Sequence, residues 1–168
     1  MNKTLKRIAV AVVVVAVGIQ AVRPARTNPP VVPSQTIYAQ MHVPADVRAI
    51  LERSCRDCHS NETRWPWYSN VAPVSWLVVD DVNHGRSHLN FSEWAGYDEE
   101  RSRELLGDIA KEVKMGEMPL RSYLMMHGDA KLGEDAGKLI SWGESRGWVA
   151  RQAAEPGKNH DHAKPHKH

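Results

Sequence analysis

The sequence of 168 residues has only two cysteines, and no stretch of it alternates apolar and polar residues over the length of a β-strand. It contains no internal repeat, and its first 42 residues contain no aspartate or glutamate. The absence of strand patterns, together with apolar residues at helical spacing, predicts an all-α fold. Hydrophobic residues make up 42% of the chain, which is enough for one modest domain with appendages.

Charge is unevenly distributed along the chain. Residues 1–42 carry five Lys/Arg and no acid, whereas residues 43–150 carry 13 Lys/Arg against 18 Asp/Glu. The central part is therefore acidic. Affinity for nucleic acid comes mainly from neutralising phosphates, so an acidic body argues against nucleic acid as a partner.

Residues 1–22 are expected to be a signal peptide or a membrane anchor. Lys3, Lys6 and Arg7 form a basic start, and an apolar run follows from Ile8 to Val22. As a helix this run spans roughly 22 Å, short of the ~30 Å hydrocarbon core, and that length is usual for a signal peptide. The other form is an uncleaved anchor with its basic end in the cytoplasm. Both forms place the rest of the chain in the periplasm, tethered to the inner membrane or released after cleavage.

Three further regions are expected after this segment. Residues 23–42 are interpreted as a linker, because four prolines between Arg23 and Thr36 favour extended chain. Residues 43–150 form the domain. Residues 151–168 contain four histidines together with proline and glycine, and we expect a disordered tail. A role of these histidines in binding metal is the alternative.

The domain is expected to contain four helices. Apolar periodicity and capping signals place them near residues 44–54, 74–83, 98–116 and 134–147. Gly85, Gly116 and Gly147 are expected to end the last three. Four helices with long irregular connections make a thin core, and such a domain would benefit from a large internal prosthetic group.

Both cysteines lie in the stretch SCRDCHSNETRWPW, from Ser54 to Trp67. Within it, Cys55, Cys58 and His59 form C-x-x-C-H, the attachment motif of c-type haem. Two intervening residues let one helical turn present both thiols to the two haem vinyl groups, and the histidine is then placed as the proximal iron ligand. The motif predicts one haem c per chain, with Cys55 and Cys58 as its covalent thioethers and His59 on the iron.

Three other interpretations of the cysteine pair were weighed. A redox-active dithiol needs a strand-to-helix context, which the sequence lacks. A zinc site needs further ligands, and no second cysteine pair exists. A disulfide across C-x-x-C closes only a small loop and stabilises little.

A second iron ligand is expected in the stretch KMGEMPLRSY. Met118 precedes Pro119, which stiffens the loop, and follows Gly116, which ends a helix. A thioether sulfur is a soft ligand that favours ferrous iron and raises the reduction potential. We therefore predict Met118 as the distal ligand. The other residues considered are Met115, His84, His88 and His127, with Met125 and Met126 expected to fill the core instead.

The residues after the motif are expected to support the haem. Trp65, Trp67 and Tyr68 are expected to pack around its edge and exclude water. A backbone carbonyl of Pro66 or Pro73 is expected to accept the hydrogen bond of the proximal histidine Nδ1–H, which fixes its tautomer.

The order of these motifs resembles class I cytochromes c, and more specifically the small bacterial haem-binding domain family. The resemblance rests on C-x-x-C-H-S-N-x-T-x-W-P-W-Y, A-P-V-S-W, L-N-F-S-x-W and G-x-M-P, and covers about residues 28–148. It implies a monohaem c-type domain on a cytochrome-c-like helical fold. Carried over to this chain, it implies Cys55 and Cys58 as haem attachments, His59 as proximal ligand and Met118 as distal ligand.

Two functions are compatible with this pattern. The first is a one-electron carrier of the bacterial cell envelope with His/Met-ligated iron, which is not an enzyme; no particular redox partner follows from the sequence. The second is a five-coordinate haem sensor or a peroxidase-type domain, which needs an open distal side and a polar residue such as His127 or Arg121. The Met-Pro loop favours the carrier.

Overall fold

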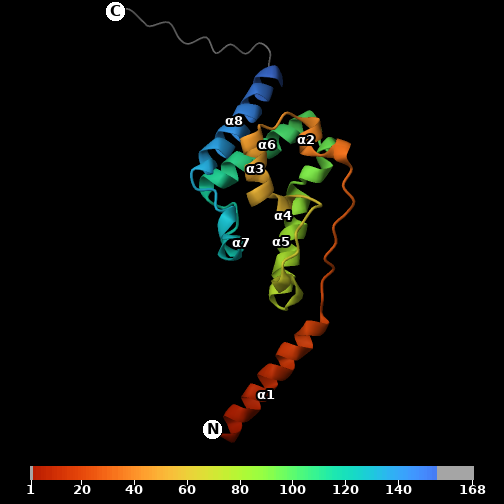
Figure 1. Ribbon diagram of the computed structural model, residues 1–168, viewed down its shortest axis with the longest axis vertical. Coiled ribbons are helices and arrows are strands. Elements are labelled where there is room, and N and C mark those ends of the chain that lie inside the picture. The colour runs from red at the N-terminus through yellow and green to blue at the C-terminus, as the bar shows by residue number, and fades with distance from the viewer. Residues whose placement is uncertain (1, 155–168) are drawn as a thin grey trace, which may run out of the picture.

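Figure 1 shows the computed structural model, in which residues 2–154 are described; a long isolated helix, α1 (Lys3–Gly18), leads into a compact helical domain. The domain contains α2 (Ile37–Gln40), α3 (Ala45–Ser54), α4 (Arg56–His59), α5 (Val74–His88), α6 (Glu99–Met115), α7 (Arg121–Met126) and α8 (Asp135–Ala154). Short 3-10 turns lie at Ile19–Ala21, Pro33–Gln35, Trp67–Asn70, Phe91–Gly96 and Gly128–Ala130. No strand occurs in the described part of the chain, so the prediction of an all-α fold is confirmed.

The two helices with the clearest end signals form as predicted. Pro44 precedes α3. The buried side of this helix consists of four residues at helical spacing, Val47, Ile50, Leu51 and Ser54. Asp98 caps α6, because its Oδ1 accepts a hydrogen bond of 2.7 Å from the backbone N–H of Arg101. Gly116 ends the same helix with φ of 73°, a left-handed conformation that glycine adopts without strain.

Two predicted helix ends are wrong. α5 continues through Gly85 to His88, and α8 continues through Gly147 to Ala154. Gly85 sits inside the helix because its missing side chain makes room for a neighbouring element, so it is used for packing and not for termination. The predicted tail begins within α8 at residues 151–154, and its remainder, residues 155–168, lies outside the described residues.

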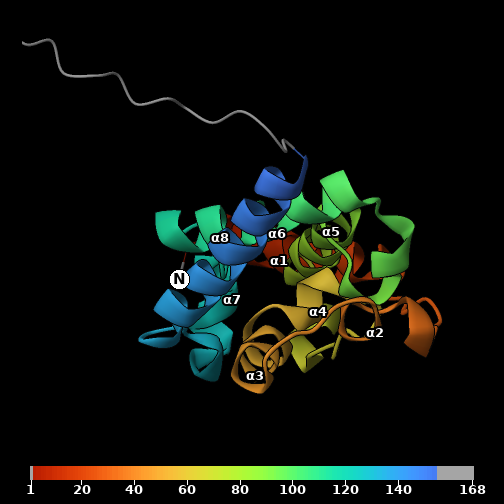
Figure 2. The same ribbon diagram turned by 90° about the horizontal axis from the view of Figure 1, so that it is seen from above.

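The core is built by α3, α6 and α8 with the segment around Phe91 and Trp94. α6 and α8 lie side by side over much of their length (Figure 2). Gly143 allows this approach: a Cβ added there would lie 2.6 Å from the Leu106 carbonyl oxygen and 3.0 Å from the Ala110 Cβ. The fully buried Leu139 and the buried Trp142 complete the same contact.

The linker predicted over residues 23–42 is only partly extended, because Pro33–Gln35 and α2 are helical and Ile37 is fully buried in the core cluster. The segment from Val22 to Val32 has no regular secondary structure and runs along the domain. Its residues are hydrogen-bonded along the domain: Trp76 Nε1 donates to the Val22 carbonyl at 2.8 Å and Arg86 donates to the Thr27 carbonyl at 2.8 Å. The linker is therefore part of the domain surface, and it fixes where α1 leaves the domain.

Gly143→Ala tests the close packing of α6 and α8. The added methyl group must displace the α6 backbone, so we expect the free energy of unfolding to fall by about 1–3 kcal/mol. Gly137→Ala is the matched control on the same helix, because a Cβ there has no neighbour within 4 Å. It should be neutral or stabilising by up to ~1 kcal/mol. Thermal unfolding followed by circular dichroism compares the two, and equal effects would contradict the close approach.

Candidate functional site

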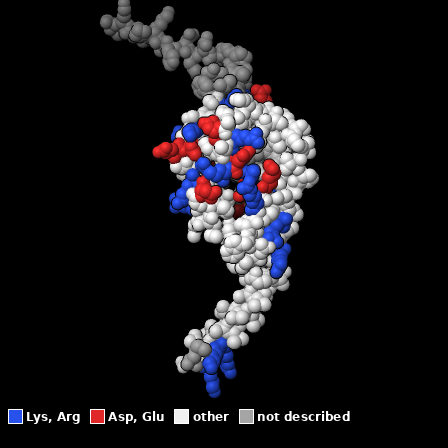
Figure 3. Space-filling view, viewed as in Figure 1, with Lys and Arg blue, Asp and Glu red and all other residues white. Residues whose placement is uncertain are grey.

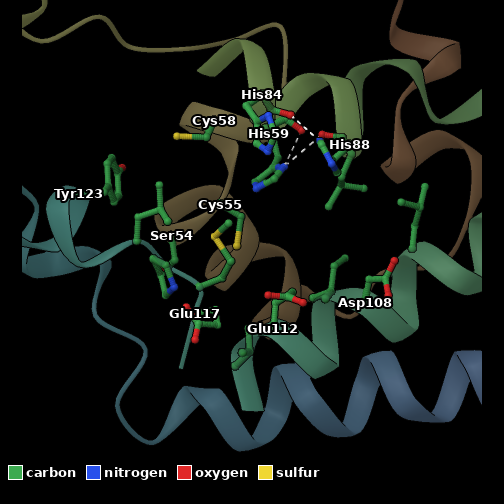
Figure 4. Close-up of a pocket in the computed structure, with 18 of the residues that line it drawn as sticks. Ser54, Cys55, Cys58, His59, His84, His88, Asp108, Glu112, Glu117 and Tyr123 are labelled. Carbon is green, nitrogen blue, oxygen red and sulfur yellow. Dashed lines mark hydrogen bonds between the residues drawn. The ribbon is translucent and has the colours of Figure 1, made fainter. Parts of the chain in front are cut away.

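A cavity of about 640 Å³ lies between α4, α5, α6 and α7. Its wall is largely apolar, with Leu89, Phe91, Leu105, Ile109, Val113 and Leu120 among the lining residues. The volume is in the range of about 300–1,000 Å³ typical of sites that hold small organic ligands and cofactors. Figure 4 shows the labelled residues that surround it, contributed by segments far apart in the sequence.

The structure brings the four predicted site residues to this one cavity. Cys55, Cys58 and His59 line it from α4 and its start, and Met118 lines it from the loop after α6. The other methionines considered, Met115, Met125 and Met126, do not line the cavity and are 60%, 84% and 55% exposed. The expectation that Met125 and Met126 fill the core is therefore wrong.

His59 is held in one tautomer by two backbone carbonyls. Its Nδ1 lies 3.1 Å from the carbonyl oxygens of both Gly85 and Leu89 (Figure 4). Carbonyl oxygens only accept hydrogen bonds, so Nδ1 carries the proton and Nε2 keeps its lone pair. Burial lowers the pKa of His59, which also favours the neutral ring. A neutral imidazole with a free Nε2 is the form that binds a metal.

Neither Pro66 nor Pro73 supplies the acceptor for His59, so that prediction is wrong. The acceptors come from the C-terminal end of α5, where the helix dipole is negative; the Gly85 carbonyl also accepts a hydrogen bond of 2.9 Å from the Leu89 backbone N–H. α5 reaches His59 because Gly85 has no side chain: a Cβ there would lie 2.7 Å from the Cys58 carbonyl oxygen. The sequence signal for this contact is Gly85 itself, so the prediction that this glycine ends the helix is wrong.

Buried polar residues connect the segment after His59 to the segment after α5. Asn61 Oδ1 accepts from Asn90 Nδ2 at 2.9 Å, and the Asn61 backbone N–H donates to Ser92 Oγ at 3.0 Å. Asn61 Nδ2 also donates to Glu93 at 3.0 Å. These residues belong to the S-N-x-T and L-N-F-S stretches of the sequence. Their contact holds Leu89, whose carbonyl accepts from His59, in place.

The two thiols are in their reduced form and have raised pKa values. Burial raises the pKa of Cys55 to about 12, and burial with the nearby Asp81 and Asp57 carboxylates raises that of Cys58 to about 12. A redox-active C-x-x-C dithiol needs a thiolate, and its pKa is lowered to about 3.5–7.5. The environment of Cys55 and Cys58 is therefore opposite to that of a reactive dithiol. Their side chains point toward the cavity (Figure 4).

The three histidines considered as ligands lie in different places. His84 and His88 are exposed on α5 at the edge of the cavity, with ring centroids 4.3 Å apart. His127 does not line the cavity, and its ring stacks on Tyr123 at 4.0 Å between centroids. Tyr123 in turn donates a hydrogen bond of 3.0 Å to Asp57, inside the C-x-x-C-H motif. Burial and the Asp57 charge raise the pKa of Tyr123.

The three aromatic residues after the motif do not line the cavity, so the prediction that they surround its contents is wrong. Trp65 donates through Nε1 to Asn28 at 3.2 Å and fastens the linker. Tyr68 contacts His127 edge to face, and Trp67 is 72% exposed. Sequence reasoning instead missed Tyr123, Phe91 and the apolar face of α6 as wall residues, because nothing in their spacing relates them to the cysteines.

The residues present fit a haem group. The cavity is apolar, and it carries two thiols and an imidazole nitrogen that is free to bind a metal. Ser54 Oγ, which belongs to a cavity-lining residue, is buried and has no hydrogen-bond partner among the described residues. An unpaired buried hydroxyl is costly unless a ligand satisfies it.

Asn61→Ala tests the contact that supports the His59 acceptors. It leaves the buried Asn90 amide without its partner, so we expect the free energy of unfolding to fall by about 1–3 kcal/mol. Asn70→Ala is the control, because the Asn70 amide donates only to the exposed Trp67 carbonyl in the same turn; a change below about 0.5 kcal/mol is expected. Thermal unfolding of both variants is the measurement. An Asn61→Ala protein as stable as Asn70→Ala would show that the contact between Asn61 and Asn90 does not stabilise the fold.

Comparison with known families agrees with the residues of this site. A family model described as a haem-binding domain matches residues 14–145, which is more than half of the 168-residue chain and includes the whole cavity wall. Comparison with curated proteins and with solved structures finds no match. The match over most of the chain identifies it: the protein belongs to the haem-binding domain family and is a haem-binding protein.

Proposed function

We propose that the protein is a monohaem c-type cytochrome of the cell envelope that carries one electron. Cys55 and Cys58 hold the haem through thioether bonds, His59 Nε2 is the proximal iron ligand and Met118 is the distal ligand. The observation that carries the proposal is the convergence of these four residues on one apolar cavity, with His59 Nδ1 already occupied by two carbonyls. In this proposal the helical domain holds the haem as a cytochrome-c-like domain would.

Haem supplies an iron ion that changes between the ferrous and ferric states. The chain's own contribution is to hold the ligands and to keep water away. The carbonyls of Gly85 and Leu89 orient the His59 ring and make it a stronger donor. The loop between Gly116 and α7 holds Met118 at the wall, and apolar side chains from α6 exclude water. A low-dielectric pocket of this kind disfavours an increase in net charge, which raises the reduction potential.

The electron-carrier role is supported by the position of the two residues considered for the polar distal group of a sensor or peroxidase-type site, although Glu117, next to Met118 in the chain, also lines the wall. A sensor or peroxidase-type site needs such a group, and Arg121 and His127 were the residues considered for it. Neither lines the cavity, and His127 is engaged with Tyr123 and Tyr68. The chain is therefore proposed to have no catalytic residue.

We place the domain in the periplasm, tethered to the inner membrane by α1. The continuous helical segment Lys3–Ala21 is apolar and long enough to cross a membrane, and none of it is buried against the domain. Its basic residues, Lys3, Lys6 and Arg7, are at the end expected on the cytoplasmic side. Release after cleavage is the other form, and N-terminal sequencing of the native protein distinguishes the two.

Covalent attachment is tested on protein matured with a cytochrome c assembly system. The haem should stay with the polypeptide on a denaturing gel and through acid–acetone extraction, because thioether bonds survive both treatments. Cys55→Ala with Cys58→Ala should lose covalent haem completely and yield little folded protein. Ser122→Ala, an exposed serine outside the cavity wall, is the control and should retain full attachment. Haem that extracts freely from the wild-type protein would refute the c-type assignment.

The distal ligand is tested with Met118→Ala. The ferric protein should lose the weak long-wavelength absorption band of an iron–thioether bond, its reduction potential should fall, and the ferrous form should bind carbon monoxide. Met115→Ala is the matched control, because Met115 lies three residues earlier but is 60% exposed and outside the wall. It should leave all three properties unchanged. Rapid carbon monoxide binding by the wild-type ferrous protein would instead favour the five-coordinate alternative.

A further inference from the structure

The start of α5 and the turn before it form an apolar surface that the haem site does not use. We define the basal face as Trp67, Val71, Val74 and Leu77, which are 72%, 44%, 42% and 64% exposed. They lie within eleven consecutive positions, on the 3-10 turn Trp67–Asn70 and the first turns of α5. The first turn of α5 contains no acidic residue, although acids are favourable there. Contiguous exposed apolar residues of this kind mark an interaction surface.

The basal face lies where α1 meets the domain. Gln20, just after α1, makes two hydrogen bonds of 3.0 Å with the backbone of Ala72, donating to its carbonyl and accepting from its N–H. Trp76, on the first turn of α5, donates to the Val22 carbonyl at 2.8 Å. Figure 1 shows the start of α5 at the end of the domain nearest to α1. These bonds fix the direction in which α1 leaves the basal face.

The length of the N-terminal helical segment indicates how far the junction with the domain lies from the centre of a bilayer. The helical segment Lys3–Ala21 has 19 residues, about 28 Å at 1.5 Å per residue, with Lys3, Lys6 and Arg7 at its cytoplasmic end. Its apolar part is shorter than the ~30 Å hydrocarbon core, which draws the periplasmic end of the segment to the membrane surface. With the segment inserted, Ala21 lies near the membrane surface. Since Gln20 and Val22 are bonded directly to the domain, the residues around Ala72 lie within the headgroup region.

The residues around this junction have the composition of a membrane interface. Tryptophan is enriched at the level of the lipid headgroups, and the basal face presents Trp67 at its most exposed position. Arg23 and Arg26 are exposed on the adjoining linker, where Arg26 donates to Ser69 at 3.4 Å. Arginines beside an apolar surface pair with lipid phosphates. In Figure 3 the lower end of the domain, next to α1, shows no acidic residue and one basic patch at its right edge, whereas the body above it carries both signs.

We propose that the basal face is a second membrane contact, in which Trp67, Val71, Val74 and Leu77 insert into the headgroup region of the bilayer that α1 spans. The occupant is the phospholipid surface. The inference rests on the proposed tether and extends it: the domain is held in one orientation on the membrane, not suspended from a flexible linker. α5 then runs from the membrane surface at Val74 to the His59 acceptors at Gly85 and Leu89. The haem site is thereby kept at a fixed height above the bilayer.

The test uses the full-length holoprotein reconstituted in vesicles of phosphatidylethanolamine and phosphatidylglycerol. A single cysteine is introduced by Leu77→Cys on the basal face, Val12→Cys within α1, or Glu144→Cys on α8, and labelled with an environment-sensitive fluorophore. All three sites are exposed, and α8 lies at the end of the domain away from α1 (Figure 1). Wild-type protein treated in the same way gives the labelling background of Cys55 and Cys58. The fluorescence of each labelled variant is compared in vesicles with and without quencher lipid, which carries its quencher near the headgroup or deep in the acyl chain. Quenching by the haem is the same in both kinds of vesicle and cancels in the ratio.

We expect the Leu77 label to be quenched at least twofold by the shallow quencher, the Val12 label by the deep quencher, and the Glu144 label by neither. Quenching at Val12 without quenching at Leu77 would leave the tether intact and overturn the basal-face contact. No quenching at Val12 would refute the tether and the contact together. A Leu77 label that has blue-shifted emission but is insensitive to lipid quencher would show that protein covers the face, and would also overturn the proposal.

Discussion

The hydrogen bonds from His59 Nδ1 to the carbonyls of Gly85 and Leu89 are the constraint around which the site is built. They require the end of α5 to lie against the turn that carries the two cysteines, and this contact is possible only because residue 85 has no side chain. The same contact determines the tautomer of the histidine, since both acceptors are carbonyls. A ring fixed in this way presents Nε2 to the cavity without any cost of reorientation when a metal binds.

The polar residues near the motif help to hold His59 and the end of α5 together. Arg86, one residue after Gly85, donates to the Ser60 carbonyl at 2.8 Å and to Thr63 Oγ1 at 2.7 Å. Asn61 joins the same region to Asn90 and Ser92. The chain after His59 is thus attached to both sides of the α5 end by buried hydrogen bonds, whose donors and acceptors satisfy one another. These polar residues beside an apolar cavity serve to position His59.

The sequence was sufficient for features that depend on neighbours along the chain. The helix class, the buried side of α3, the start of α6 near Asp98 and its end at Gly116 each follow from local spacing and backbone preferences. The C-x-x-C-H motif is local as well, and its assignment to haem agrees with the family match. Features that depend on packing between distant segments could not be predicted in this way. In the sequence, a glycine that ends a helix cannot be told from one that lets a neighbouring segment pack closely. Only the position of Cys58 in the fold shows that Gly85 has the second role.

The aromatic residues illustrate the same limit. Trp65, Trp67 and Tyr68 follow the motif by a few residues, but none of them lines the cavity; Trp67 and Tyr68 lie on the 3-10 turn Trp67–Asn70. Wall residues such as Leu105 and Ile109 come instead from α6, about fifty residues later in the chain. Proximity in sequence therefore led to a wrong prediction for the aromatic residues. The position of Met118 at the wall was predicted from a different signal, the helix end at Gly116 and the proline that follows Met118.

The position of the cavity relates cofactor binding to the stability of the fold. α4 and α5 pack on each other, α6 packs on α8, and α3 connects the two pairs, while the cavity separates α5 from α6. Leu105 and Ile109 of α6 belong to the buried core cluster and also line the cavity, so a group held in the cavity adds to the apolar contacts of this core. A ligand that binds only the folded state stabilises it in proportion to its affinity. The haem site thus lies where a helical domain without a cofactor would have a hydrophobic contact between helices. α5 connects this site to the basal face, next to α1.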